Sequence, residues 1–223
     1  MYRIFIGYDS KEVECYHVLS HSIMKHAKSP VSITPLKREL LPLWRERNDM
    51  ESTEFSFSRF LVPFLSDYEG WSLFMDCDML VTQDITNLFK QADERFSLLC
   101  VQHAPYKATE HKFLGQNNTN YERKNWSSMM LFNNKHCTVL TPRSVNRLDG
   151  LNLHRFLWLE DGMIGNLDHQ WNYLVGEQYW MTANGHMPPA NIHWTLGGPW
   201  FEEYKDTDFA DLWKQYRDEV RDG

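Results

Sequence analysis

The chain has 223 residues, of which 42% are hydrophobic and 24% charged, which suits one folded domain with a sizeable core and argues against disorder. Its formal net charge is -7 and no basic block stands out, so nucleic-acid binding is not expected. No apolar run approaches the roughly 18 residues of a membrane span, and the first residues lack the pattern of a signal peptide. No transmembrane segment is therefore expected. The four scattered cysteines form no Cys-x-x-Cys pair, which predicts a reducing, cytoplasmic location.

Predicted strands and helices alternate through the first half of the chain. Ser10 is expected to cap the first helix, and Pro63 to kink or end the second. In chain order, the predicted elements are a strand over 2–9, a helix over 11–27, a strand over 31–36, a helix over 54–66, a strand over 71–76, a short helix over 84–92 and a strand over 96–102.

The second half continues this alternation after a long polar segment over 103–125. Thr141 is the expected N-cap of a helix with Pro142 in its first turn and Gly150 past its end. The other predicted elements are strands over 128–133 and 191–196 and an amphipathic helix over 207–220. This order predicts a single α/β domain over 1–223 with a mixed or parallel sheet, in which ligands gather at the carboxyl ends of the strands.

The stretch "FMDCDMLV" places Asp76 and Asp78 at the end of an apolar strand. On an extended strand the two side chains would project to the same side. Two carboxylates about 6 Å apart repel by roughly 2–3 kcal/mol at an effective dielectric near 20. A hard divalent cation with oxygen ligands would offset this repulsion. The alternative interpretation is a strand that ends in a solvated turn, where aspartate is common.

Two classes of enzyme place an Asp-x-Asp pair after a strand. Haloacid-dehalogenase-type phosphatases have it after the first strand, whereas metal-dependent nucleotide-sugar glycosyltransferases have it after a strand in mid-chain. Here at least two strands and two helices are predicted before Asp76. The position therefore favours the glycosyltransferases.

The sequence resembles the retaining glycosyltransferases of family eight, the glycogenin and bacterial galactosyltransferase group with the GT-A fold. Four landmarks carry the resemblance in the family's order: "IGYD" at the end of the first strand, "SRFLVPFL" with Arg59, "FMDCDMLV", and "IHWTLGGPW". The resemblance implies a GT-A fold with a mixed central sheet flanked by helices. It also implies transfer of a hexose from a nucleotide-sugar, with a UDP-sugar expected, to an acceptor hydroxyl with retention of configuration, and a requirement for Mn²⁺ or Mg²⁺.

The resemblance also implies roles for individual residues. The metal would be bound by Asp76, Asp78 and His193. The implied nucleotide-binding residues are Gly7, Tyr8, Asp9, Arg59, Cys77, Gly197 and Gly198. Ser127 and Ser128 stand where the family has the Asn-(Ser/Ala)-Gly strand that touches the donor sugar, and they are predicted to contact substrate with Lys112 and Lys124 of the polar segment. Glu160 and Asp161 would act near the anomeric carbon. For Arg59, a surface arginine whose stem covers apolar neighbours is the alternative interpretation.

The chain departs from the family pattern where the family has a lysine before Pro-Trp. Gly198 stands at that place, so another base must assist the leaving group, and Lys112, Arg123 and Lys124 are candidates. These three belong to the segment 103–125, which we expect to close over the donor or acceptor as a lid. Tyr106, Lys112, Tyr121 and Lys124 would then face the site. A solvated excursion without function is the alternative.

Two other functions compete with glycosyl transfer. A degenerate protein that binds a nucleotide-sugar without transferring it would explain the missing lysine. A sugar nucleotidylyltransferase would carry a Gly-rich loop with Arg or Lys after the first strand, which "GYDSKEVECY" lacks. The acceptor, a glycan or another hydroxyl compound, is not specified by any motif.

Overall fold

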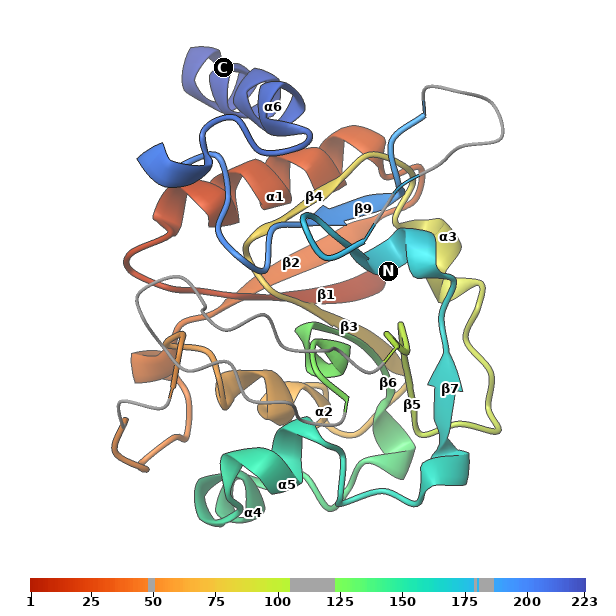
Figure 1. Ribbon diagram of the computed structural model, residues 1–223. Coiled ribbons are helices and arrows are strands. Elements are labelled where there is room, and N and C mark those ends of the chain that lie inside the picture. Colours follow the sequence, from red (N-terminus) through yellow and green to blue (C-terminus); the bar gives the residue numbers. More distant parts are fainter. Residues whose placement is uncertain (48–50, 105–122, 179, 181–186) are drawn as a thin grey trace.

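The fold is described from a computed structural model of the chain, for residues 1–47, 51–104, 123–178, 180 and 187–223. A six-stranded sheet forms its centre (Figure 1). In spatial order the strands are β2 (Val31–Leu36), β1 (Tyr2–Gly7), β3 (Trp71–Met75), β6 (Met129–Asn133), β5 (Leu98–Cys100) and β7 (Ile164–Asn166). Only β6 runs antiparallel to its neighbours, so the expected mixed α/β sheet is confirmed.

The central strands are apolar on both faces because both faces are covered. Every residue of β5 and β6 is buried, as are the last four residues of β1 and β3. Near-continuous apolar runs are typical of strands with both faces covered, which is why sequence patterning located these four strands.

A second, three-stranded sheet lies beside the first, and no single sequence pattern predicted it. It contains β4 (Met79–Val81), β9 (Asn191–His193) and β8 (Tyr173–Leu174), with β9 in the middle. The chain leaves the large sheet at Met75 and enters the small sheet at Met79. The intervening residues, Asp76 to Asp78, therefore connect the two sheets.

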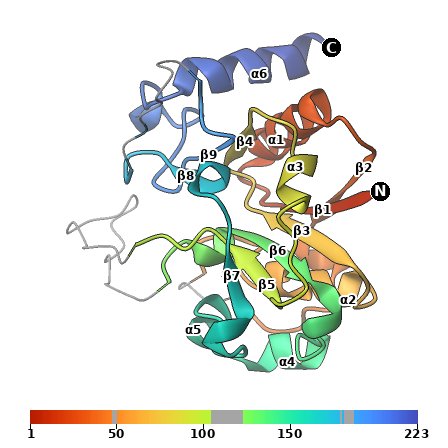
Figure 2. The same ribbon diagram turned by 90° about the vertical axis from the view of Figure 1, so that its right-hand side faces the viewer.

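Helices lie at both ends of the molecule. Their bounds are α1 (Val13–His26), α2 (Val62–Leu65), α3 (Thr86–Phe89), α4 (Pro142–Arg147), α5 (Gly150–His154) and α6 (Ala210–Asp222). Figures 1 and 2 show α1 and α6 together at one end and α4 and α5 at the other. Lys25 of α1 pairs with Glu219 of α6 at 2.6 Å. None of the helices that the structure describes has the length and apolar character needed to cross a lipid bilayer.

Two expected helix boundaries are wrong. Ser10 does not cap α1, because its hydroxyl donates to Glu54 Oε1 at 2.6 Å and the helix begins after Glu12. Gly150 does not follow α4 but begins α5, which Asp149 caps by accepting from the Asn152 amide. The predicted N-cap at Thr141 is confirmed, since its side chain accepts from Ser144 N.

The predicted helix over 54–66 is also shorter than expected. A 3-10 helix over Ser58–Leu61 is followed by the single turn of α2, in whose first turn Pro63 lies. Proline is tolerated there because that position needs no amide hydrogen bond. The apolar stripe that predicted a long helix reflects burial of Phe57 to Val62 within the core.

Candidate metal centre

Three chain segments meet at the carboxyl end of β3. Ile6 pairs with Met75, so the residues after β1 and after β3 lie at the same edge of the sheet. The segment before β6 joins them, because Asp76 N donates to Ser128 O at 2.9 Å. This convergence is the expected one for parallel strands of an α/β sheet.

Asp76, Asp78 and His193 lie together at this edge. Each offers one ligand atom, and these atoms all lie within 4.8 Å of one another. The pairing of β4 with β9 causes this, because Met79 lies opposite His193 and Trp194 N donates to Asp78 O at 3.0 Å. The expectation that an extended strand aligns the two aspartates is wrong: the chain bends at Cys77 and Asp78 between two sheets.

Asn172 holds the imidazole of His193 in place. Its Oδ1 lies 2.9 Å from His193 Nδ1, and its amide nitrogen donates to Ser128 Oγ at 2.9 Å. His193 Nε2 then faces Asp78 Oδ1 at 3.3 Å. A hydrogen bond to one ring nitrogen is what commonly fixes the other nitrogen for metal binding. Asn172 is fully buried, and nothing in the sequence singled it out.

The two aspartates differ in their electrostatic environment. Burial raises the pKa of Asp76 to about 7, although the Arg59 guanidinium opposes this rise. Burial also acts to raise the pKa of Asp78, but the charge of His193, with smaller effects of the same sign, outweighs it and lowers the pKa. Burial acts to lower the pKa of His193, and the carboxylates of Asp78 and Asp76 reverse that effect and raise it. The cluster thus stabilises positive charge.

These residues fit a bound divalent cation. Asp76 Oδ1 and Asp78 Oδ1 are buried, and neither accepts a hydrogen bond of normal geometry from the described part of the chain, although each belongs to an ion pair. Buried carboxylate oxygens of this kind are costly unless a charge compensates them. Two carboxylates and one imidazole form a ligand set for a hard or borderline metal ion.

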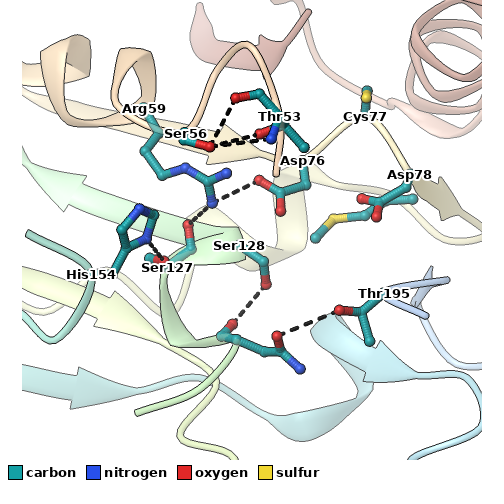
Figure 3. Close-up of polar contacts among 12 residues, drawn as sticks. Thr53, Ser56, Arg59, Asp76, Cys77, Asp78, Ser127, Ser128, His154 and Thr195 are labelled. Carbon is teal, nitrogen blue, oxygen red and sulfur yellow. Dashed lines mark hydrogen bonds and ion pairs between the residues drawn. The ribbon is translucent and has the colours of Figure 1, made fainter. Parts of the chain in front are cut away.

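Arg59 is a buried residue of this centre and not a surface arginine. It is 5% exposed, and its guanidinium lies over the Phe74 ring, 4.9 Å from the centroid. Figure 3 shows its Nη1 between Asp76 Oδ1, at 2.9 Å, and the carbonyl oxygen of Ser127, at 2.8 Å. Arg59 therefore compensates the charge of Asp76 from within the protein.

Glu12 is a further carboxyl group beside the cluster that the sequence analysis missed. Its Oε1 accepts from Trp200 Nε1 at 3.2 Å, and the Cys77 thiol lies 3.8 Å from its Oε2. Burial, and then the charges of Asp78 and Asp9, raise its pKa to about 8. A lone acid before a helix carries no sequence signal for such a position.

Replacing Glu12 by glutamine is expected to stabilise the metal-free protein at alkaline pH. The folded protein retains the Glu12 proton up to about pH 8, whereas the unfolded chain loses it near 4.5, so the stability of the wild type falls as pH rises through this window. Glu12→Gln should therefore exceed the wild type by about 1–3 kcal/mol at about pH 9 and by little at about pH 4. Urea unfolding in chelator measures this; a difference independent of pH would contradict it.

Contacts within the protein explain why glycine stands at positions 197 and 198 after β9. Gly197 has φ 134°, and a Cβ there would come within 2.6 Å of the Tyr204 ring. A Cβ on Gly198 would come within 2.0 Å of the Trp200 ring, so the ring occupies the space that a lysine side chain would need. The predicted contact of both glycines with a diphosphate remains a prediction.

The residues after β1 are also engaged within the protein. A Cβ on Gly7 would clash with the Phe55 ring at 2.4 Å. Asp9 is 3% exposed and accepts from the backbone amides of Lys11 and Glu54. Tyr8 packs edge-on against Tyr16. Their proposed contacts with the nucleotide, like that of Cys77, whose side chain is fully buried, stay predictions.

The serines predicted to contact substrate are bound to other protein groups. Ser127 Oγ lies 2.7 Å from His154 Nδ1, and Ser128 Oγ donates to Asn125 O at 2.7 Å. Both residues are almost fully buried. In this structure their hydroxyl groups therefore support the site through hydrogen bonds to other protein groups.

Three of the predicted bases and catalytic acids form ion pairs within the protein. Lys124 forms an ion pair with Glu177 at 2.9 Å, and Arg123 pairs with the exposed Asp161. Glu160 and Asp161 precede β7, whose first residue, Ile164, is in register with the start of β3 and not with its end. Their catalytic roles are untested. Lys112, Tyr106, Tyr121 and most of the expected lid lie outside the described residues.

Comparison with known proteins places this geometry in a recognised fold. No protein-family model matches the chain. The chain is 47% identical to Protein CDI of Arabidopsis thaliana over 218 aligned residues. The alignment covers 95% of this chain and 84% of that protein.

Solved structures of glycosyltransferases share the architecture at low identity. GlyE of Streptococcus pneumoniae TIGR4 matches with a TM-score of 0.63 and 17% identity over 97% of this chain, which spans 60% of the GlyE chain. The bifunctional WbbM matches with a TM-score of 0.63 and 15% identity, and the chain spans 51% of it. An active-site mutant of LgtC matches with a TM-score of 0.61 and 11% identity over 97% of this chain and 95% of LgtC. The expected GT-A fold is confirmed.

Proposed function

The chain belongs to the family of Protein CDI from Arabidopsis thaliana, and from this premise and the GT-A fold we propose that it is a metal-dependent glycosyltransferase. It transfers a hexose from a nucleotide-sugar, with UDP as the preferred nucleotide, to an acceptor hydroxyl group with retention of configuration. The finer parts of the proposal, including the relation to family eight, Mn²⁺ or Mg²⁺ as the metal and a cytoplasmic location, rest on the sequence motifs. The four buried, unpaired cysteines are consistent with a reducing compartment.

One observation carries the proposal: Asp76, Asp78 and His193 converge from two different sheets at the carboxyl end of β3. A galactosyltransferase of the same fold, LgtC, has been solved with donor and acceptor sugar analogues. This supports a donor and an acceptor sugar as the substrates here. Two carboxylates held side by side repel one another, and a divalent ion would offset this repulsion in addition to Arg59 and His193.

The chain's own residues prepare this edge for a charged donor. Arg59 favours the ionised form of Asp76, and Asn172 keeps the His193 ring oriented toward Asp78. A divalent ion held there would supply positive charge to the pyrophosphate of the departing nucleotide. The low exposure of Asp76 and Asp78 limits solvent screening, so these charges act strongly on one another.

Turnover of the donor tests the proposal. Protein washed with chelator is incubated with UDP- and GDP-sugars, with and without added Mn²⁺, and release of the free nucleotide is measured. We expect Mn²⁺-dependent release from a UDP-hexose. Binding of the donor without release would favour a nucleotide-sugar-binding protein, for which the glycine at position 198 in place of a lysine is the supporting observation. Absence of both binding and release would refute both functions.

A further inference from the structure

His154, at the end of α5, is connected to the metal ligand Asp76 through two intermediate residues. His154 Nδ1 lies 2.7 Å from Ser127 Oγ. The carbonyl oxygen of the same serine accepts from Arg59 Nη1 at 2.8 Å, and this nitrogen lies 2.9 Å from Asp76 Oδ1. Figure 3 shows the four side chains in this order. We call them the His154–Asp76 relay.

The segment that contains Ser127 supports Asp76 at two places. It directs Arg59 toward the carboxylate, as described. In addition, the carbonyl oxygen of the neighbouring Ser128 accepts a hydrogen bond from the backbone amide of Asp76 at 2.9 Å. A small shift of this segment would therefore move both the backbone of Asp76 and its counter-ion. Ser127 is 6% exposed, so its hydrogen bond to His154 has little competition from water.

The aromatic surroundings of His154 fix its ring. The ring packs edge-on against Phe60, with 5.1 Å between centroids, and against Phe57 at 6.3 Å. Burial and the charge of Arg59 lower its pKa to about 3, against a hydrogen bond to the Ser56 backbone that acts to raise it. The ring is therefore neutral, with one donor and one acceptor nitrogen. Because the N–H of the ring is directed at the Ser56 backbone, Nδ1 accepts a hydrogen bond from the Ser127 hydroxyl group.

A serine bonded to a histidine can also be an activated nucleophile. A ring as weakly basic as that of His154 is a poor general base near neutral pH. Since Ser127 and His154 cannot act efficiently in that way, a role in orientation fits the geometry better.

From these contacts, and given the proposed metal-dependent function, we propose that His154 is a positioning residue for the metal centre. It anchors Ser127, whose carbonyl orients Arg59 and thereby keeps Asp76 in place to bind the ion. His154 touches neither metal nor donor in this role, and it lies outside all four motifs that carry the family resemblance.

Mn²⁺ titration of purified variants by calorimetry tests the relay. His154→Leu and Ser127→Ala should each weaken Mn²⁺ binding about three- to tenfold, the effect of losing one hydrogen bond of ordinary net strength. Combining them should weaken binding no further, because both remove the same bond. His154→Asn should restore most of the affinity, because its amide oxygen is as many bonds from Cα as Nδ1. At saturating Mn²⁺, donor turnover by His154→Leu should largely recover.

His26→Leu is the matched control. His26 Nε2 is hydrogen-bonded to the Tyr216 hydroxyl at 2.6 Å, in the contact between α1 and α6. This variant should lose folding stability and keep wild-type Mn²⁺ affinity. Ser127→Ala opens almost no cavity, so it tests the relay even if His154→Leu does not fold.

Normal Mn²⁺ affinity in Ser127→Ala or His154→Leu would overturn the relay, as would additive losses in the double variant or an equal loss in His26→Leu. A wild-type protein without affinity for Mn²⁺ would overturn the proposed function itself, and the relay with it. The two failures are therefore distinguishable.

Discussion

Asp78→Asn is expected to abolish Mn²⁺ binding and Mn²⁺-dependent release of nucleotide from the donor. The substitution removes a carboxylate whose ordinary partners are His193, at 3.3 Å, and the proposed ion. Changing a residue that only supports a metal ligand typically costs about 10–100-fold in affinity or activity, so loss of a ligand charge should cost at least about 100-fold. Calorimetry with Mn²⁺ and a nucleotide-release assay on chelator-washed protein measure both effects.

Asp84→Asn provides the control for this substitution. Asp84 lies outside the cluster and accepts hydrogen bonds from the Thr86 amide and hydroxyl, which asparagine can also accept. It should retain wild-type metal affinity and turnover. An unchanged rate in Asp78→Asn, with the fold intact by circular dichroism, would show that the acid pair does not bind the metal.

Lys124→Met is expected to lower the free energy of unfolding by about 3–5 kcal/mol, as is usual when one partner of a buried ion pair is removed. The side chains of Lys124 and Glu177 are 4% and 6% exposed, and their charged atoms lie 2.9 Å apart. Removing the lysine leaves a buried carboxylate without its main counter-charge. Urea denaturation at neutral pH measures the loss.

A second substitution separates the charge effect from lost packing. Lys124→Met combined with Glu177→Gln should recover much of the stability, because no uncompensated charge remains. Lys205→Met removes a partner from the exposed pair with Glu202, whose side chains are 53% and 82% exposed, and should leave the free energy of unfolding nearly unchanged. A similar small loss in Lys124→Met would mean that the buried pair is well solvated.

The Lys124–Glu177 pair also changes the interpretation of Lys124. The sequence made this lysine a candidate to assist the leaving group in place of the family's lysine. In the structure its charge is directed to Glu177, which follows β8, and that carboxylate also contributes to the raised pKa of His193. Lys124 therefore joins two segments beside the metal centre. Assistance by Lys112 stays a prediction, because that residue lies outside the described part of the chain.

Sequence patterning worked where a signal is local. The apolar runs of β1, β3, β5 and β6 located the central strands, because strands with both faces covered need apolar side chains at nearly every position. It failed at the predicted helix over 54–66, because burial of that segment on several sides produces an apolar stripe without a regular helix. The boundary at Ser10 was missed because a tertiary partner, Glu54, binds its hydroxyl group, and the boundary at Gly150 because a new helix capped by Asp149 begins there.

The candidate site was predicted in part. The spacing of Asp76 and Asp78 and the order of four motifs were enough to nominate the ligands and the class of enzyme. Glu12, Asn172 and His154 were missed, since each acts through partners that are distant in sequence: Trp200 for Glu12, His193 for Asn172 and Ser127 for His154. No periodicity or spacing records such contacts.

By itself, then, the sequence determined an α/β chain with an acidic pair after its third strand, because hydrophobic periodicity and residue chemistry are properties of neighbours along the chain. Only the tertiary structure decided that the pair lies in a bend between two sheets, with His193 brought beside it by the pairing of β4 and β9. The physical reason is that the protonation and orientation of these groups depend on burial, on the charge of Arg59 and on the hydrogen bond between Asn172 and His193. These residues come close to one another only when the chain folds.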